Sequence, residues 1–259
     1  MHQELKRAAR AEVERLFGED APRPVQFGDI GELDFPFFSM GSIDSRNLFD
    51  LDELIIFSFY RKNRGRYKNV LDVGANIGLH STLLSLMGYT VRCFEPDPVH
   101  FELLQRNLKA NGCSNVEPHA AAMSDSDGET EFCRVKGNTT GSHIKGAKAN
   151  PYGELDYFPV KIEAANPHLK WADLVKMDVE GHEPTILTAT DRDIWEGTDA
   201  FVEIENAENG AIVFEHMSKL GVNLFAEKLN WQRVRSAEDM PAGYKEGSLF
   251  VSVKDAMPW

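Results

Sequence analysis

The hydrophobic positions of the chain form two alternating patterns, short apolar runs and longer stripes with helical spacing. The runs predict buried strands at residues 70–73, 91–96, 115–119, 172–177, 201–206, 222–226, 231–235 and 248–253. The stripes predict helices at residues 48–63, 79–87 and 98–110, from Pro184 onwards and at 209–220. Because helices alternate with strands, the pattern predicts an α/β fold with a mostly parallel sheet and helices on both of its faces.

Two segments stand outside this core pattern. We expect residues 1–50 to form an N-terminal extension that packs on the core as a cap, and a β insertion to follow the third strand. The segments concerned are an amphipathic helix at 2–17, hairpin strands at 25–27 and 33–38, and inserted strands at 130–135 and 156–162. Because no linker or repeat separates the extension from the core of residues 51–259, we expect a single domain.

Composition narrows the class of protein. With 259 residues, 42% of them hydrophobic and 27% charged, the chain can bury one sizeable core. No apolar run approaches the roughly twenty residues that span a bilayer, and the N-terminus lacks the apolar core of a signal peptide. We therefore expect a cytoplasmic protein without a membrane span. The net charge of −13 argues against a nucleic-acid partner, and the three cysteines are expected to be reduced packing residues.

One stretch, residues 69–80, combines a strand, a tight turn and the start of a helix. Gly74, Asn76 and Gly78 occupy alternate positions of the turn, and these residue types tolerate a positive φ. This arrangement is the first half of a nucleotide-binding βαβ unit. Glu95 ends the next strand about twenty residues past the first glycine, where a carboxylate can accept hydrogen bonds from both ribose hydroxyls.

The turn favours a nucleoside without phosphates. Asn76 and Leu79 stand where a dinucleotide fold has its second and third glycines, and Asp72 would put a negative charge near a pyrophosphate. S-adenosylmethionine is a cationic nucleoside with one ribose and no phosphate. The turn therefore resembles motif I of the Rossmann-like methyltransferases that use S-adenosylmethionine.

Three strings together are similar to the FkbM family of methyltransferases, namely DVGANIG (72–78), FEP (94–96) and VKMDVEGHE (175–183). The similarity extends from about Leu51 to the C-terminus, and the third string is the most specific to that family. The resemblance implies a class I methyltransferase fold with a mostly parallel seven-stranded sheet, which binds S-adenosylmethionine and releases S-adenosylhomocysteine. It also implies O-methylation of a hydroxyl on a sugar, a polyketide or a related small molecule.

The cofactor site is expected around the turn and at the ends of the following strands. Residues 120–125 are small or flexible until an acid, which leaves room for a flat ring such as adenine. The ligand crevice of an open α/β sheet lies at the carboxyl ends of its strands, where Asp178 follows the fourth strand. The expected cofactor-binding residues are Asp72, Gly74, Ala75, Asn76, Gly78, Glu95, Pro96, Met123, Ser124, Asp125 and Asp178.

Four ionisable residues crowd together at the end of the fourth strand, namely Asp178, Glu180, His182 and Glu183. A hydroxyl acceptor benefits from a general base, and His182 is the first candidate because the unperturbed pKa of histidine is near neutral. Asp178 is the second candidate, as the base or as the group that orients His182, and Glu180 completes the predicted catalytic group. Glu183 also suits the dipole at the start of a helix.

Contacts with the acceptor are expected from two further places. The polar loop at 137–143 is placed to reach over the transfer site, which makes Asn138 and His143 candidates. Glu203 and Glu205 share one side of the fifth strand near its end, so one of them should face the crevice. The expected acceptor is a small molecule, carbohydrate or polyketide-like.

Three alternatives stay open at this point. A divalent metal ion is a subsidiary hypothesis, because the acids and His182 are suited to Mg²⁺ or Ca²⁺, but no metal-ligand spacing is distinctive and we favour metal-free catalysis. A nicotinamide-dependent oxidoreductase shares the fold but has a different glycine pattern. A non-catalytic cofactor-binding protein would keep residues 72–95 and have no need of the acids at 178–183. The sequence pattern does not indicate whether the protein is a monomer or an oligomer.

Overall fold

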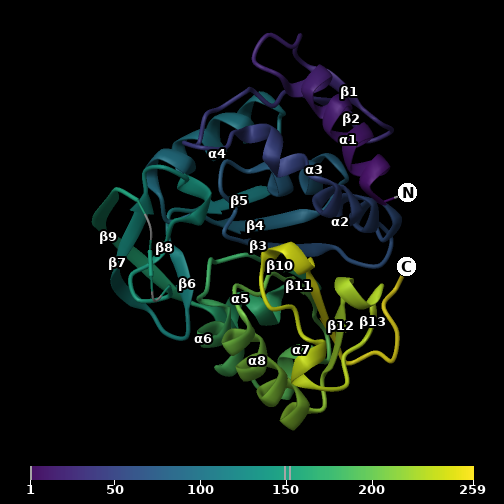
Figure 1. Ribbon diagram of the computed structural model, residues 1–259, viewed down its shortest axis with the longest axis vertical. Coiled ribbons are helices and arrows are strands. Elements are labelled where there is room, and N and C mark those ends of the chain that lie inside the picture. Colours follow the sequence, from purple (N-terminus) through teal and green to yellow (C-terminus); the bar gives the residue numbers. More distant parts are fainter. Residues whose placement is uncertain (1, 149, 152) are drawn as a thin grey trace.

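The computed structural model describes every residue of the chain except 1, 149 and 152. The described residues form one large sheet with helices on both faces and a smaller sheet at one side (Figure 1). Eight strands of the described chain make up the large sheet, in the order β13-β12-β14-β11-β10-β3-β4-β5. They are β3 (Asn69–Val73), β4 (Thr90–Phe94), β5 (Val116–His119), β10 (Leu174–Met177), β11 (Asp199–Val202), β12 (Asn223–Ala226), β13 (Gln232–Arg233) and β14 (Leu249–Ser252).

The centre of the large sheet is parallel. β3 pairs in parallel with β4 and β10, and the parallel pairing continues to β5 on one side and to β11 on the other. β14 lies antiparallel between β11 and β12. The predicted α/β class with a mostly parallel sheet is confirmed. The sheet has eight strands, one more than the family resemblance implies, because β13 forms within the run predicted at residues 231–235 and pairs with β12.

Helices on the two faces create two hydrophobic cores. Val70 and Leu71 of β3 face opposite cores, as the alternation of side chains along a strand requires. The first core is covered by α1 (His2–Phe17), α2 (Leu51–Lys62), α3 (Leu79–Leu86) and α4 (Pro98–Ala110). The second core is covered by α5 (Ala165–Trp171), α6 (Glu183–Thr188), α7 (Arg192–Trp195) and α8 (Ala207–Leu220).

The N-terminal extension is part of the first core. It comprises α1, the hairpin of β1 (Val25–Phe27) and β2 (Gly31–Leu33), and the 3-10 helix η1 (Ser45–Phe49). Phe17 of α1 stacks on Phe49 of η1 with ring centroids 4.1 Å apart, and both side chains are buried. The helix predicted at residues 2–17 therefore packs its apolar side on the rest of the protein.

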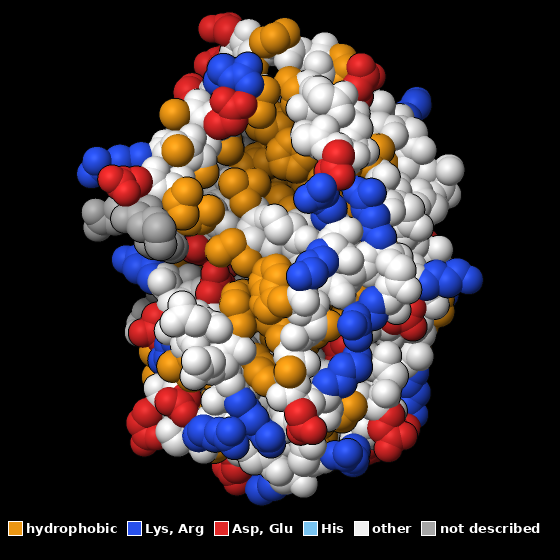
Figure 2. Space-filling model, turned by 90° about the vertical axis from the view of Figure 1, so that its right-hand side faces the viewer, with side chains coloured by type: hydrophobic (Ala, Val, Ile, Leu, Met, Phe, Trp, Pro, Cys, Tyr) orange, Lys and Arg blue, Asp and Glu red, His pale blue; other side chains and the backbone are white. Residues whose placement is uncertain are grey.

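α2, β12, β13 and the two chain ends lie on the same side of the molecule (Figure 1). Figure 2 shows this face, where a hollowed band of hydrophobic side chains runs beside a column of Lys and Arg. Trp231 packs against the edge of the first core, and its ring centroid lies 6.2 Å from that of Trp259. The C-terminal residues thus complete this side of the core.

Between β5 and α5 the chain forms the second sheet, with strand order β6-β9-β7-β8. Its strands are β6 (Ala122–Ser124), β7 (Gly128–Val135), β8 (His143–Ile144) and β9 (Leu155–Ala164). The two long strands β7 and β9 contain the residues predicted as inserted strands and pair antiparallel with each other. The short β6, which follows β5 in the chain, pairs in parallel with the end of β9.

The loop after β7 is bonded to the N-terminal extension, in a contact that we call the clasp (residues 40–42 and 137–139). The Ser42 amide donates a hydrogen bond to the Gly137 carbonyl over 2.7 Å, and the Thr139 amide donates to the Met40 carbonyl over 3.0 Å. Gly41 lies between these bonds with φ +93°. A Cβ atom at Gly41 would lie 2.3 Å from the Gly137 carbonyl oxygen, so the close approach requires glycine.

Several predicted boundaries are wrong. The fifth strand ends at Val202, and residues 203–206 follow it instead of extending it. The second hairpin strand covers Gly31–Leu33 and does not reach residue 38, since residues 34–38 form no strand. The helix predicted at 48–63 is divided at Asp50 between η1 and α2.

Candidate cofactor and acceptor site

A cavity lies at the carboxyl ends of β3, β4 and β10. The second sheet and the loop after β7 form its far wall, and Leu48 of η1 lines it from the N-terminal extension. The cavity brings together seven of the predicted site residues, namely Gly74, Asn76, Glu95, Pro96, Met123, Asp178 and Glu180.

The glycine turn forms one wall of the cavity. Gly74, Asn76 and Gly78 all have positive φ, at +78°, +52° and +85°. A Cβ atom at Gly74 would lie 1.8 Å from the carbonyl oxygen of Asp178, so this position has no space for a side chain. Positive φ is uncommon in residues other than glycine, and two of the four examples in the described chain, Asn76 and Glu180, line this cavity. Such strain is concentrated at functional sites in proteins.

The carboxylate of Glu95 is oriented by the backbone. One of its oxygens accepts a hydrogen bond from the Asn76 amide and the other from the Asp97 amide, each over 2.8 Å. Each oxygen retains a lone pair for a further donor. Burial raises the pKa of Glu95 to about 8, although these two amides favour its charged form. The acid predicted from its spacing thus faces the cavity in a fixed orientation.

Three predicted residues of the turn lie behind the cavity wall. Asp72 is completely buried, accepts a hydrogen bond from the Ser81 hydroxyl over 2.6 Å and lies 3.9 Å from the Lys176 ammonium. Ala75 is also buried, and Gly78 begins α3 at a position where a Cβ atom would lie 3.0 Å from Leu104. The charge of Asp72 is thus balanced by Lys176 behind the wall, and Asp72 does not line the cavity. The carboxylates that do line the cavity are those of Glu95, Asp178 and Glu180.

Met123 is the one of the three predicted adenine neighbours that lines the cavity. The Ser124 hydroxyl is directed away, to His182 Nε2 at 3.0 Å and to Asp125 at 3.2 Å, and Asp125 is exposed. The rest of this apolar end is formed by Phe94 of β4 and by residues of the second sheet, Phe132 and Ile144.

His182 lies immediately before α6 and outside the residues that line the cavity. Its ring contacts the Ser124 hydroxyl, and burial lowers its pKa. The neighbouring Glu183 carboxylate accepts hydrogen bonds from the amides of Val179 and Gly181, both over 3.0 Å, and therefore stabilises the turn before α6. Burial raises the pKa of Glu183 to about 7.

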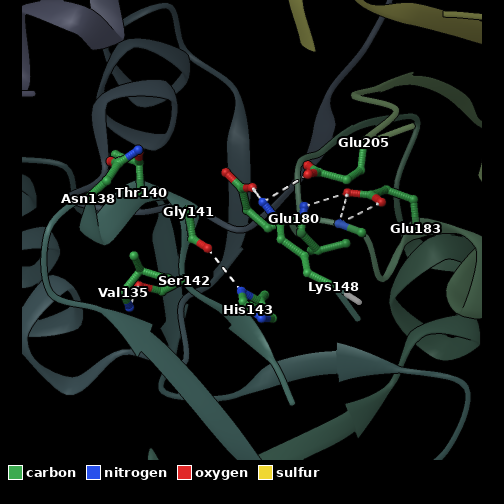
Figure 3. A network of polar contacts seen from close by, with 12 residues as sticks. Val135, Asn138, Thr140, Gly141, Ser142, His143, Lys148, Glu180, Glu183 and Glu205 are labelled. Atoms are coloured by element: carbon green, nitrogen blue, oxygen red, sulfur yellow. Dashed lines mark hydrogen bonds and ion pairs between the residues drawn. The ribbon is translucent and has the colours of Figure 1, made fainter. Parts of the chain in front are cut away.

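A lysine connects two of the predicted acids, of which one, Glu180, lines the cavity. Figure 3 shows the Lys148 ammonium between the carboxylates of Glu180 and Glu205. The distance from Lys148 Nζ to Glu205 Oε1 is 3.1 Å, and the contact with Glu180 is a direct hydrogen bond. Burial and the nearby Asp178 carboxylate raise the pKa of Glu180 to about 8, while Lys148 acts in the opposite direction.

The other predicted acceptor residues do not line the cavity. Asn138 belongs to the clasp, and its side-chain oxygen accepts a hydrogen bond from Thr140 over 2.7 Å. His143 is buried, with Nδ1 3.0 Å from the Gly141 carbonyl (Figure 3), and burial lowers its pKa. Glu203 is half-buried just past β11, where burial and the charges of Asp178 and Glu180 raise its pKa.

Four residues that the sequence analysis missed contribute to the site. His100, in the first turn of α4, lines the cavity with Thr139, and its Nε2 lies 2.9 Å from the Thr139 hydroxyl. His100 has no sequence signal, because the contact joins α4 to the loop after β7, whereas Thr139 lies in the polar loop that was predicted to reach over the site. Lys148 likewise comes from a loop. For Lys176 a signal existed, since a lysine inside a buried apolar strand is rare.

The strand order and the cavity at the carboxyl edge of the sheet define the class I methyltransferase fold. Residues 72–221 match the family model described as the methyltransferase FkbM domain, and the chain belongs to this family.

Individual relatives are more distant. The chain is 29% identical over 156 residues to Methyltransferase 1 of Beauveria bassiana, and this match covers 51% of this chain and 62% of that protein. It is 28% identical over 162 residues to the hexuronic acid methyltransferase AglP of Haloferax volcanii, and this match covers 61% of this chain and 65% of AglP. The chain thus spans less than two thirds of the length of these relatives. A solved precorrin-6y C5,15-methyltransferase from Geobacter metallireducens has a TM-score of 0.41 and 13% identity over 76% of this chain and 84% of that one.

None of the helices that the structure describes combines the length and hydropathy needed to cross a membrane. Among the same described residues, no three His, Cys, Asp or Glu side chains are grouped as ligands for a metal ion.

Proposed function

We propose that this protein is an S-adenosylmethionine-dependent methyltransferase that transfers a methyl group to a hydroxyl of a sugar or another small natural product. The observation that carries the proposal is the orientation of Glu95, whose carboxylate faces the cavity beside the glycine turn. Membership of the FkbM methyltransferase family supports it.

The residues of the cavity fit this cofactor. The backbone of Gly74 and Asn76 allows close approach, and Glu95 would accept hydrogen bonds from the ribose hydroxyls. Met123 and Phe94 form an apolar end for the adenine. When bound, S-adenosylmethionine supplies an electrophilic methyl group on a positively charged sulfur. Carboxylates on the cavity wall favour this cation over a phosphate-bearing nucleotide.

We propose Asp178 as the general base, or as the group that orients the acceptor hydroxyl. Asp178 lines the cavity, whereas the His182 ring is directed towards Ser124. A base must lie within hydrogen-bond reach of the proton that it removes, and position is considered before pKa. Holding the acceptor in line with the methyl group would supply most of the remaining rate enhancement.

A hydroxyl-rich acceptor without a carboxylate suits the charges of this site best. The carboxylates of Glu180 and Glu205 can accept hydrogen bonds from hydroxyls. Lys148 is paired with these two acids, and Lys176 lies among further acids, so neither ammonium is available to an anion. We therefore favour a neutral sugar or polyketide over a hexuronic acid, the substrate in the name of AglP.

The test is calorimetry with S-adenosylhomocysteine. We expect saturable binding by the parent and binding at least tenfold weaker by Glu95→Gln, because the variant replaces one of the two acceptor oxygens that face the ribose with an amide donor. Glu102→Gln is the matched control, since Glu102 is an exposed residue of α4 paired with Arg106, and its affinity should equal that of the parent.

The outcomes separate the candidate functions. No binding of the methyl donor or its product by the parent would reject the proposal, and binding of NAD in their place would identify an oxidoreductase. Binding of the cofactor without turnover across neutral, acidic and amino-bearing hydroxyl acceptors would identify a non-catalytic cofactor-binding protein.

A further inference from the structure

Lys176 is a buried cation at the centre of the large sheet. It belongs to β10, and its side chain is 11% exposed. In the parallel register of β3 and β10 it lies beside Asp72. Both residues project to the face covered by α2 and α3, where the Ser81 hydroxyl donates to Asp72. A lysine in such a position persists only when its charge is compensated.

The ammonium group contacts both halves of the cavity wall. It donates a hydrogen bond to the Gly74 carbonyl over 3.3 Å and lies 3.6 Å from Asp178 Oδ2. Gly74 and Asp178 line the cavity from different strands. Lys176 itself does not line the cavity, so it affects a ligand only through these neighbours.

Acids surround this lysine on several elements. Asp178 and Asp72 are the nearest, and Glu53 of α2 and Glu203 beyond β11 add to the negative charge. Burial lowers the pKa of Lys176, but the four carboxylates outweigh burial and raise the pKa above its usual value. The side chain is therefore a permanent cation and has no role as a base.

We propose that Lys176 is a positioning residue for methyl transfer, which fixes the Gly74 carbonyl and the Asp178 carboxylate relative to each other across the cofactor cavity. The inference rests on the proposed function, since it concerns the cofactor of that reaction. The glycine turn and the acid that follows β10 come from separate strands, and a single ammonium group bonds both.

A purely structural role is the rival explanation. Asp72 is completely buried, and its Oδ1 has no hydrogen-bond partner among the described residues, with Lys176 at 3.9 Å as its counter-charge. Lys176→Met alone would leave this carboxylate unpaired and destabilise the fold under either explanation. A useful test must therefore remove both charges together.

The decisive variant is Asp72→Asn/Lys176→Met, compared with the parent and with Lys176→Met. Thermal unfolding and the affinity for S-adenosylhomocysteine are measured for each protein. We expect the double substitution to recover part of the melting temperature that Lys176→Met loses, because residue 72 then carries no buried charge in need of a counter-charge. Its affinity should nevertheless stay at least tenfold below that of the parent. Lys219→Met, on the exposed side of α8, is the matched control and should bind like the parent.

Recovery of the parent's affinity by the double variant would overturn the proposal, because Lys176 would then serve only to neutralise Asp72. Asp72→Asn/Lys176→Gln keeps a polar side chain at residue 176 and provides the same comparison if the methionine variant does not fold. Failure of the parent to bind S-adenosylhomocysteine would reject the proposed function itself. Binding by the parent together with unweakened binding by the double variant would reject only the role of Lys176.

Discussion

At the scale of single residues, Asp178 and His182 illustrate how the backbone decides which side chain reaches a cavity. Only a short turn separates them, yet Asp178 lines the cavity and His182 contacts Ser124 on β6. The turn contains Glu180 at φ +55° and Gly181 at φ +102°. This left-handed geometry directs the residues on either side of it to different places.

We expect Asp178→Asn and His182→Ala to have unequal effects on turnover. Removing a general base typically costs 10²–10⁴-fold, so Asp178→Asn should lower kcat at least about 100-fold. His182→Ala should stay within about tenfold of the parent because its ring contacts Ser124. The measurement is methyl transfer to a hydroxyl acceptor at saturating cofactor. An equal or larger loss in His182→Ala would restore His182 as the base.

Single residues could be predicted from the sequence where local chemistry determines their position. The position of Glu95 follows from a strand end at a fixed distance from the glycine turn, and its carboxylate does face the cavity. The direction of His182 depends on a positive φ at Glu180, which a sequence does not reveal for a glutamate. The partners of Asp72 likewise depend on the register of β3 with β10, so the counter-charge on Lys176 was missed.

At the scale of elements, the site is completed by two segments outside the alternating strands and helices. The N-terminal extension and the loop after β7 meet in the clasp. Thr139 of the clasp also contacts His100 of α4, and both residues line the cavity. Apolar periodicity could predict the strands and helices of the core, but it could not predict the clasp, because the clasp consists of backbone hydrogen bonds between segments distant in the sequence.

Gly41→Ala tests the clasp, with Gly146→Ala as its control. Both glycines have φ +93°, but a Cβ atom at Gly146 has nothing within 4 Å, whereas at Gly41 it would contact the Gly137 carbonyl oxygen. Both variants therefore carry the strain of a positive φ, but only Gly41→Ala adds a clash with the backbone. We expect Gly41→Ala to lose about 1–3 kcal/mol more of the free energy of unfolding than Gly146→Ala, measured by urea denaturation. Equal losses would show that the clasp contributes nothing.

At the scale of the whole molecule, the excess of acids is concentrated in part inside the protein. The chain has a net charge of −13, and the carboxyl groups of Glu95 and Glu180 line the same cavity. Burial raises the pKa of each of these two groups to about 8. Folding therefore retains protons that the unfolded chain releases, and stability is linked to pH.

We expect the free energy of unfolding to fall between about pH 7 and about pH 8.5. Groups with a raised pKa give stability that is complete below the unfolded pKa and is lost as pH rises through the folded pKa of about 8. The loss should be about 1–2 kcal/mol, measured by urea denaturation. Glu95→Gln/Glu180→Gln lacks both titrations and should show a smaller change. A constant or rising stability in the parent would contradict this expectation.

The burial of the N-terminal extension in the first core has a practical consequence for dividing this protein. The stretch recognised by homology, residues 72–221, begins inside β3 and excludes α2 and the strands β12–β14. A fragment cut at those limits would lose one edge of the sheet and uncover the surface against which Phe17, Phe49 and Phe59 pack. The unit of recognisable ancestry is therefore smaller than the unit of cooperative folding. Swaps or grafts between family members should carry the flanking segments along.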